Sequence, residues 1–193
     1  QSVRAYLDPR WKGRAVIANP LFGTTTDQMG ALFALWGDDE GRRFLEGMKG
    51  NRVRVSTSNG ESADLVASGE MDFGLVDSDD AFSRIKEGKP IEMVIPDQGA
   101  DGAGVLIVPN AVVLIKNGPH PGAARKLVDF LLSKDAERML AFADCAQIPL
   151  HAGVETPSQV LRIETLKVMK VDFARVAHTV QQIQPLLKAW AGY

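Results

Sequence analysis

The feature that most limits the fold of this chain is an alternation of short apolar runs with amphipathic segments. The short runs end at Pro, Asn or Asp, as strands do, and the segments between them repeat apolar residues at helical spacing. Met29, Leu32, Phe33 and Trp36 share one helical face, for example. The first part of the chain predicts strands over 14–20, 51–58 and 71–77, and helices over 25–37, 40–50, 61–70 and 80–88.

The same alternation continues beyond residue 90, around a glycine-rich stretch at 97–104 that is typical of a hinge. The pattern predicts further strands over 91–96 and 105–116, helices over 121–133 and 134–143, and a mostly helical tail over 159–190. Strands that alternate with helices predict an α/β protein with mixed or parallel sheets.

Composition excludes several classes of protein. The chain has 193 residues, 45% hydrophobic and 24% charged, which suits one globular domain or two small lobes. A net charge of −2 with scattered Lys and Arg argues against a nucleic-acid partner. The single cysteine, Cys145, excludes an intrachain disulfide and a multi-cysteine metal site. No run approaches the length of a membrane span, and the opening residues lead us to expect a mature product or a piece of a longer protein.

A first candidate site follows the first strand, at NPLFGTTTDQ (19–28). The N–H groups at the start of a helix lack internal partners and carry partial positive charge. Gly23 allows a ligand to approach the backbone, and Thr24 and Thr25 add hydroxyl groups. The turn is a candidate anion site, or an ordinary helix start capped by Thr24 or Thr25.

A second candidate site lies after the second strand, at STSNG (56–60). Ser58 or Asn59 is a natural helix cap there. Because the carboxyl ends of strands in an open α/β sheet gather at one edge, these residues are also expected to line a ligand site.

A third candidate is the acidic turn GLVDSDDAF (74–82), with Asp77, Asp79 and Asp80 at the end of the third strand. Ser78 or Asp79 can cap the next helix, whose first turn favours acidic residues. The carboxylates can instead bind a metal ion such as Ca²⁺, Mg²⁺ or Fe³⁺. A strand followed by Asp-x-Asp also resembles the haloacid-dehalogenase-like phosphatases, but Asp80-Ala81 stands where their motif has Gly-Thr.

Several motifs in order together resemble the periplasmic solute-binding proteins of ABC importers, in the branch that includes ferric-iron binders. They are LDPRWKGR (7–14), the strand and Gly-Thr-Thr helix after it, SNGESADLVASGEMDFGLVDSDDA (58–81), PHPGAARKLVDFLLSKDAERMLA (119–141) and QIPLHAGV (147–154). The resemblance implies a periplasmic-binding-protein-like fold of class II, with two lobes of mixed sheets flanked by helices that close over a ligand.

The resemblance also implies a domain organisation. Residues 7–96 correspond to the α/β domain of the second lobe, 97–145 to a return segment into the first lobe, and 146–193 to a C-terminal helical segment. The chain corresponds to the C-terminal portion of such a protein, and we expect the opening strands of the first lobe to precede it. A fragment of this kind is a candidate for homodimer formation.

The ferric binders of this family carry two adjacent tyrosines at positions that match Asp79 and Asp80. The only tyrosines here are Tyr6 and Tyr193, so the phenolate iron site is not preserved. The family also binds an anion at the turn that matches Gly23–Thr25. A carboxylate pair still suits a hard cation, an amine or sugar hydroxyls, and the sequence does not choose among these.

The sequence therefore predicts a non-enzymatic, extracytoplasmic substrate-binding component of an ABC transporter, soluble or lipid-anchored. Its ligand is a metal ion such as ferric iron, or a phosphorylated or phosphonate anion; its partner is a membrane permease, and no cofactor is expected. The expected ligand-binding residues are Gly23, Thr24, Thr25, Ser58, Asn59, Asp77, Asp79, Asp80 and Gln98, with Asp77, Asp79 and Asp80 as metal ligands. The alternatives are a phosphatase that uses the Asp77/Asp79 turn and the effector domain of a transcription regulator.

Overall fold

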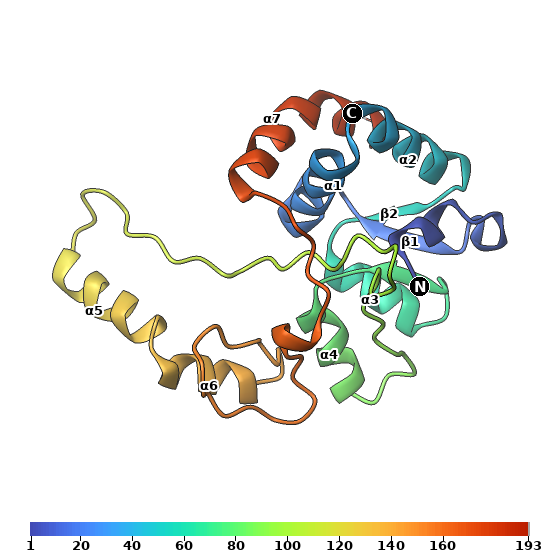
Figure 1. The fold of residues 1–193 in the computed structure, drawn as a ribbon. Coiled ribbons are helices and arrows are strands. Elements are labelled where there is room, and N and C mark those ends of the chain that lie inside the picture. The colour runs from blue at the N-terminus through green and yellow to red at the C-terminus, as the bar shows by residue number, and fades with distance from the viewer. Residues whose placement is uncertain (193) are drawn as a thin grey trace. The chain divides into compact units, whose positions relative to one another are not determined.

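The computed structural model describes residues 1–192 and divides the chain into two compact units (Figure 1). Unit 1 comprises Gln1–Ile107 together with the chain from Leu166 onward, and unit 2 comprises Val108–Thr165. The domain boundaries predicted from the sequence remain a prediction. No helix within the described residues is long and apolar enough to cross a membrane.

Unit 1 is built on a parallel three-stranded sheet in the order β2-β1-β3, with strands β1 (Ala15–Ala18), β2 (Arg54–Ser56) and β3 (Phe73–Leu75). Val16 pairs with Arg54 on one side and with Gly74 on the other. All four residues of β1 are buried, which explains why this central strand is an unbroken apolar run. The predicted α/β class is confirmed.

Helices cover both faces of this sheet (Figure 1). Ala15 and Ile17 belong to the core formed with α1 (Gly23–Trp36), α2 (Asp38–Gly50) and α7 (Phe173–Trp190). On the opposite face, α3 (Asn59–Ala67) packs against β1 and β3, and α4 (Ser78–Lys86) packs against α3. Short 3-10 helices at Val3–Leu7 and Pro9–Trp11 precede β1.

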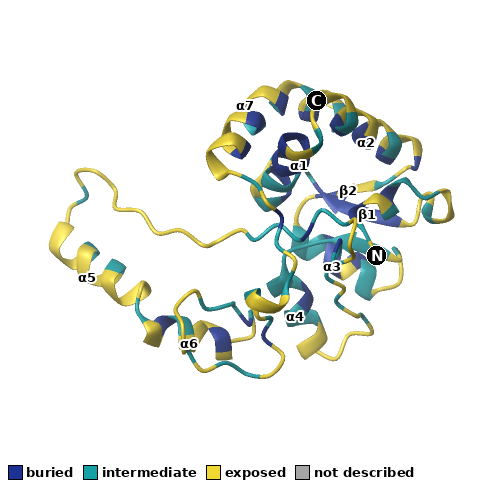
Figure 2. Cartoon of the chain, viewed as in Figure 1, coloured by how far each residue is buried: buried dark blue, intermediate teal, exposed yellow. Residues whose placement is uncertain are grey.

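Unit 2 contains α5 (Pro121–Leu131), α6 (Lys134–Phe142) and a 3-10 turn at Ile163–Thr165. The helix α5 has no buried residue, although its apolar residues recur at helical spacing, and Figure 2 shows it largely exposed. Two predicted strands are wrong: residues 91–96 form no strand, and within 105–116 only Val105 makes a bridge, to Val168. A strand needs a neighbour to hydrogen-bond with, and Pro96 and Pro109 lack the N–H that pairing requires.

The ends of two helices also differ from expectation. The N-cap of α1 is Phe22 rather than Thr24 or Thr25, and the N-cap of α4 is Asp77 rather than Ser78 or Asp79; neither makes a capping hydrogen bond with its side chain. The predicted helical tail forms a helix only over Phe173–Trp190, because the chain before Asp172 is irregular apart from one short turn.

Candidate functional site

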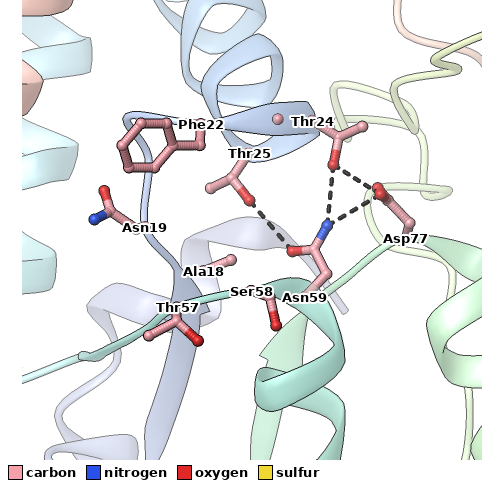
Figure 3. Close-up of a pocket in the computed structure, with 10 residues that line it drawn as sticks. Ala18, Asn19, Phe22, Thr24, Thr25, Thr57, Ser58, Asn59 and Asp77 are labelled. Carbon is pink, nitrogen blue, oxygen red and sulfur yellow. Dashed lines mark hydrogen bonds between the residues drawn. The ribbon is translucent and has the colours of Figure 1, made fainter.

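Three strand-to-helix turns meet at the carboxyl edge of the sheet, because the three strands run in parallel. Residues 19–22 join β1 to α1, residues 57–58 join β2 to α3, and residues 76–77 join β3 to α4. Together they surround a pocket of about 290 Å³ (Figure 3), lined by Ala18, Asn19, Phe22, Gly23, Thr24, Thr25, Thr57, Ser58, Asn59 and Asp77.

The N-terminus of α1 forms one wall of this pocket. Its N-cap residue, Phe22, offers no side-chain acceptor to the first-turn N–H groups. Gly23 has a φ of +61°, a conformation that glycine adopts without strain. Thr26 does not face a ligand, since its hydroxyl donates to the carbonyl of Pro20 at 2.8 Å. The helix therefore presents uncapped donors, with partial positive charge, at the pocket.

Asp77 forms the facing wall and is held by two side chains from the other turns. Its Oδ2 accepts hydrogen bonds from Thr24 Oγ1 at 2.8 Å and from Asn59 Nδ2 at 3.0 Å. Asn59 Nδ2 also donates to Thr24 Oγ1 at 3.0 Å, and Asn59 Oδ1 accepts from Thr25 Oγ1 at 3.3 Å. Figure 3 shows this ring of contacts, which joins α1, α3 and the end of β3. Charge-assisted bonds of this kind fix the carboxylate in place.

The floor of the pocket comes from the turn between β2 and α3. Ser58 caps α3 by accepting from the backbone N–H of Glu61 at 3.0 Å, which confirms its predicted role as a cap. Thr57 donates through its hydroxyl to the Glu61 carboxylate, which lowers the pKa of that carboxyl. Both residues line the pocket, although their hydroxyl groups also stabilise the start of α3.

Asp79 and Asp80 stand beside Asp77 but do not line the pocket. One carboxylate oxygen from each of the three residues lies within 4.8 Å of the others, close enough to bind one metal ion. Burial raises the pKa of Asp80, the carboxylates of Asp79 and Asp77 raise it further, and Arg84 at 3.8 Å opposes them. Burial and Asp77 likewise raise the pKa of Asp27.

Gln98 lies away from this pocket and is engaged elsewhere in unit 1. Its amide nitrogen donates to the carbonyls of Pro96 and Lys167, and its amide oxygen accepts from the N–H of Lys167 at 2.8 Å. The side chain therefore joins the glycine-rich segment to the returning chain. Its assignment as a ligand-binding residue remains a prediction.

Sequence reasoning did not select Phe22, Asn19 or Thr57, which also line the pocket. Asn19 and Thr57 directly follow strands, a position that could have identified them. Phe22 gives no comparable indication, because an aromatic residue before a glycine is ordinarily assigned to the core.

Residues 2–176 match the model of a family described as bacterial extracellular solute-binding proteins. The chain belongs to this family. Membership confirms the resemblance seen in the sequence and the expected extracytoplasmic location. The family was recognisable because its motifs occur in order along most of the chain, even though each is weak alone.

Three similar proteins illustrate the branch. The major ferric iron-binding protein of Neisseria meningitidis is 27% identical over 92% of this chain and 53% of its own. A putative 2-aminoethylphosphonate-binding periplasmic protein of Salmonella typhimurium is 24% identical over 79% of this chain and 45% of its own. The periplasmic binding protein AfuA of Actinobacillus pleuropneumoniae, solved with exogenous fructose-6-phosphate, is 22% identical with a TM-score of 0.77, covering 97% of this chain and 60% of its own.

The similarity to the AfuA structure shows the fold alone, and it confirms the predicted periplasmic-binding-protein-like fold. The chain spans about half the length of the two relatives named above. These relatives are named as binding proteins, and the phosphatase alternative finds no support among them.

Proposed function

We propose that this chain carries the ligand-binding pocket of the substrate-binding component of an ABC importer. Family membership supports this function. The partner that we propose is a membrane permease, and the activity that we propose is binding without catalysis. In the mechanism that the family resemblance implies, lobes close over the solute and the permease recognises the closed form.

The observation that carries the proposal is the pairing of a donor wall with an acceptor wall in one pocket. The uncapped start of α1 suits an anionic group. Asp77, across the pocket, suits an ammonium group or sugar hydroxyls, and it is the only charged side chain among the lining residues. A phosphorylated or phosphonate solute that also carries an amine or hydroxyl groups satisfies both walls. This is the ligand class that we propose, with the first-turn N–H groups of Gly23, Thr24 and Thr25 at its anion and Asp77, whose Oδ2 also accepts from Thr24 Oγ1, at its amine or hydroxyl groups.

Ser58 and Asn59 have supporting places in this proposal. Asn59 orients Thr24, Thr25 and Asp77 through its amide. Ser58 fixes the start of α3, which carries Asn59. Both residues hold the polar side chains of the pocket in fixed positions before the solute binds, as a preorganised binding site requires.

A metal ion such as ferric iron is the second candidate ligand, because three carboxylates lie within 4.8 Å of one another. Asp77, Asp79 and Asp80 would be its ligands, all hard oxygen donors that suit such an ion. This candidate predicts that binding depends on all three carboxylates and not on the threonines of α1.

The test is calorimetric titration of the dialysed protein with an aminoalkylphosphonate, a hexose phosphate, inorganic phosphate and ferric citrate. We expect Asp77→Asn to lower the affinity for the aminoalkylphosphonate by at least about tenfold, since a charge-assisted contact with its amine is lost. The same change should leave inorganic phosphate unchanged or bound more tightly, because it removes a like charge. Asp39→Asn, on the exposed side of α2, is the matched control.

The metal candidate gives a different pattern in the same titrations. Binding of ferric citrate alone, lost in both Asp77→Asn and Asp80→Asn but retained in Thr24→Val, would assign the carboxylates as metal ligands. Binding of none of the four solutes by the wild-type protein would refute the ligand class proposed here.

A further inference from the structure

Phe22 is an aromatic side chain at the pocket that the fold does not use. It is 69% exposed, and it is absent from the apolar core of unit 1. Figure 3 shows its ring at the end of the pocket nearest Asn19, with Asp77 at the other end. An isolated exposed apolar residue is ordinary on a protein surface, so its place in the pocket needs a second argument.

Phe22 also has an unusual residue type for its position in α1. It is the N-cap residue, where Ser, Thr, Asp or Asn would stabilise the helix. Ser58, Ser133 and Asp172 each accept a first-turn N–H at the start of their helices, whereas the N-cap residues of α2, α4 and α5 make no such bond. Phe22 thus makes neither a capping bond nor a contact in the apolar core, and its exposed ring lines the pocket.

The rest of the pocket explains what that role is. Apart from Ala18 and Gly23, the other lining residues are polar. Polar walls and a helix N-terminus recognise charges and hydroxyl groups but leave the apolar faces of a solute in water. An exposed aromatic ring covers such a face and favours flat, C–H-rich or conjugated partners over chains.

We propose that Phe22 is a specificity-determining residue whose ring packs on a ring of the solute. This inference rests on the proposed function and narrows it: the solute is a phosphorylated or phosphonate compound that contains a ring, such as a sugar. Its anionic group lies at the start of α1, its hydroxyl groups reach Asp77, and one face of its ring contacts Phe22. A linear phosphonate or inorganic phosphate makes no use of Phe22.

The experiment compares Phe22→Ala and Phe22→Tyr with the wild type, using calorimetry on the dialysed chain. The probes are a hexose phosphate, a linear aminoalkylphosphonate and inorganic phosphate. We expect Phe22→Ala to weaken the binding of the hexose phosphate about tenfold. The affinities for the aminoalkylphosphonate and for inorganic phosphate should change by less than about twofold, which is less than the loss of one hydrogen bond would cause. Phe22→Tyr keeps the ring and should retain the affinity. Phe173→Ala, a half-exposed phenylalanine at the start of α7 in the same unit, is the matched control.

A thermal readout separates this role from a structural one. Phe22→Ser supplies the missing cap, so its melting temperature should rise by about 2–4 °C, while its affinity for the hexose phosphate falls. A melting temperature that falls in Phe22→Ala and Phe22→Ser alike would show that the ring supports the fold, and would overturn the inference.

The affinities also separate failure of this inference from failure of the proposed function. If the wild type binds the hexose phosphate and Phe22→Ala binds it equally well, the inference is wrong and the proposed function stands. An equal loss for all three probes would show that Phe22 shapes the start of α1 rather than contacting a ring. If the wild type binds only inorganic phosphate or the linear probe, the ring requirement is wrong; if it binds no probe, both proposals are wrong.

Discussion

The hydroxyl of Tyr6 is a buried junction between two strands of the sheet. It donates to the carbonyl of Val16 in β1 at 2.7 Å and accepts from the N–H of Leu75 in β3 at 2.7 Å. The side chain is 2% exposed, and this burial raises the pKa of the Tyr6 hydroxyl far above its ordinary value. The hydroxyl therefore stays protonated and keeps both bonds across the working pH range.

We predict that Tyr6→Phe lowers the free energy of unfolding by about 1–3 kcal/mol, because the buried Val16 carbonyl and the half-buried Leu75 N–H both lose this partner. Urea unfolding measures this as a lower midpoint with an unchanged slope. Tyr6→Leu should lose more, since the ring also packs on Phe73 with centroids 5.0 Å apart. A Tyr6→Phe protein as stable as the wild type would show that the hydroxyl makes no net contribution.

Asp80 gives the acidic turn a predictable dependence on pH. Its folded-state pKa is raised, first by burial and then by its acidic neighbours. A carboxyl group that holds its proton more tightly when folded favours folding at low pH, and this contribution is lost as pH rises from about 3.9 through the folded-state value. The ionised Asp80 carboxylate therefore lowers the stability of the folded, ligand-free protein at neutral pH.

Asp80→Asn should remove this dependence. In urea unfolding of the dialysed protein, we expect the stability of the variant relative to the wild type to increase from about pH 4 to about pH 7. Asp27→Asn should show the same direction, because burial and Asp77 raise the pKa of Asp27. A relative stability that falls over this range would mean that the charged form of Asp80 is favoured in the folded state, through Arg84.

The residues of the pocket could be predicted in part from their positions alone. Gly23, Thr24, Asn59 and Asp77 each follow a parallel strand, and parallel strands bring such positions to one edge. The choice of Gln98 rested on its place beside a glycine-rich stretch. Its partner is Lys167, 69 residues away, and no local pattern encodes a contact of that kind.

At the scale of elements, Gly30 allows α1 to pack closely against α7. A Cβ added at Gly30 would collide with Val180 Cγ2 and lie 3.3 Å from Val176 Cγ1. Gly in the middle of a helix costs about 0.5–1 kcal/mol relative to Ala. We infer that the close packing of α1 on α7 stabilises the protein by more than this loss of helix propensity.

Gly30→Ala should therefore destabilise the protein by about 1 kcal/mol or more, despite the better helix former. Gly50→Ala is the control, because a Cβ at Gly50 meets nothing within 4 Å and should be neutral or stabilising. Val180→Ala, combined with Gly30→Ala, should recover part of the loss, since neighbouring changes are not additive. Thermal and urea unfolding of the wild type, the three single variants and the double variant measure these differences. Additive losses in the double variant would count against a direct clash.

Pairing partners decide which of the predicted strands form. The three strands of unit 1 have neighbours in the chain to pair with, and they were predicted from apolar runs at β1 and β3 and from alternating valines at β2. The run at 105–116 is as apolar, but beyond its bridge at Val105 it has no strand beside it in the described chain. An apolar segment can thus form a strand, but it does so only where a neighbouring strand is available to pair with it.

At the scale of the whole molecule, unit 2 is the part with an incomplete core. Its large apolar side chains are mostly exposed: Val113 and Ile115 are 80% and 83% exposed, and Leu127 and Phe130 on α5 are also exposed. Its buried apolar residues are few and small, mainly alanines of α6 and the turn after it. Large exposed apolar side chains in such number are typical of a surface that a partner covers.

We therefore predict that the isolated chain self-associates through unit 2, with a second copy covering exposed apolar side chains such as Val113 and Ile115. An extended segment with unpaired backbone groups can pair with its own copy about a twofold axis, as exposed strand edges do. Light scattering should give a mass that rises above the 20.9 kDa of one chain as concentration increases. Val113→Asp with Ile115→Asp should restore the mass of a single chain without lowering the stability of unit 1, whereas Phe173→Asp in unit 1 should not. A single-chain mass for the unmodified protein at every concentration would refute self-association, and an oligomer that persists in the double variant would assign it to another surface.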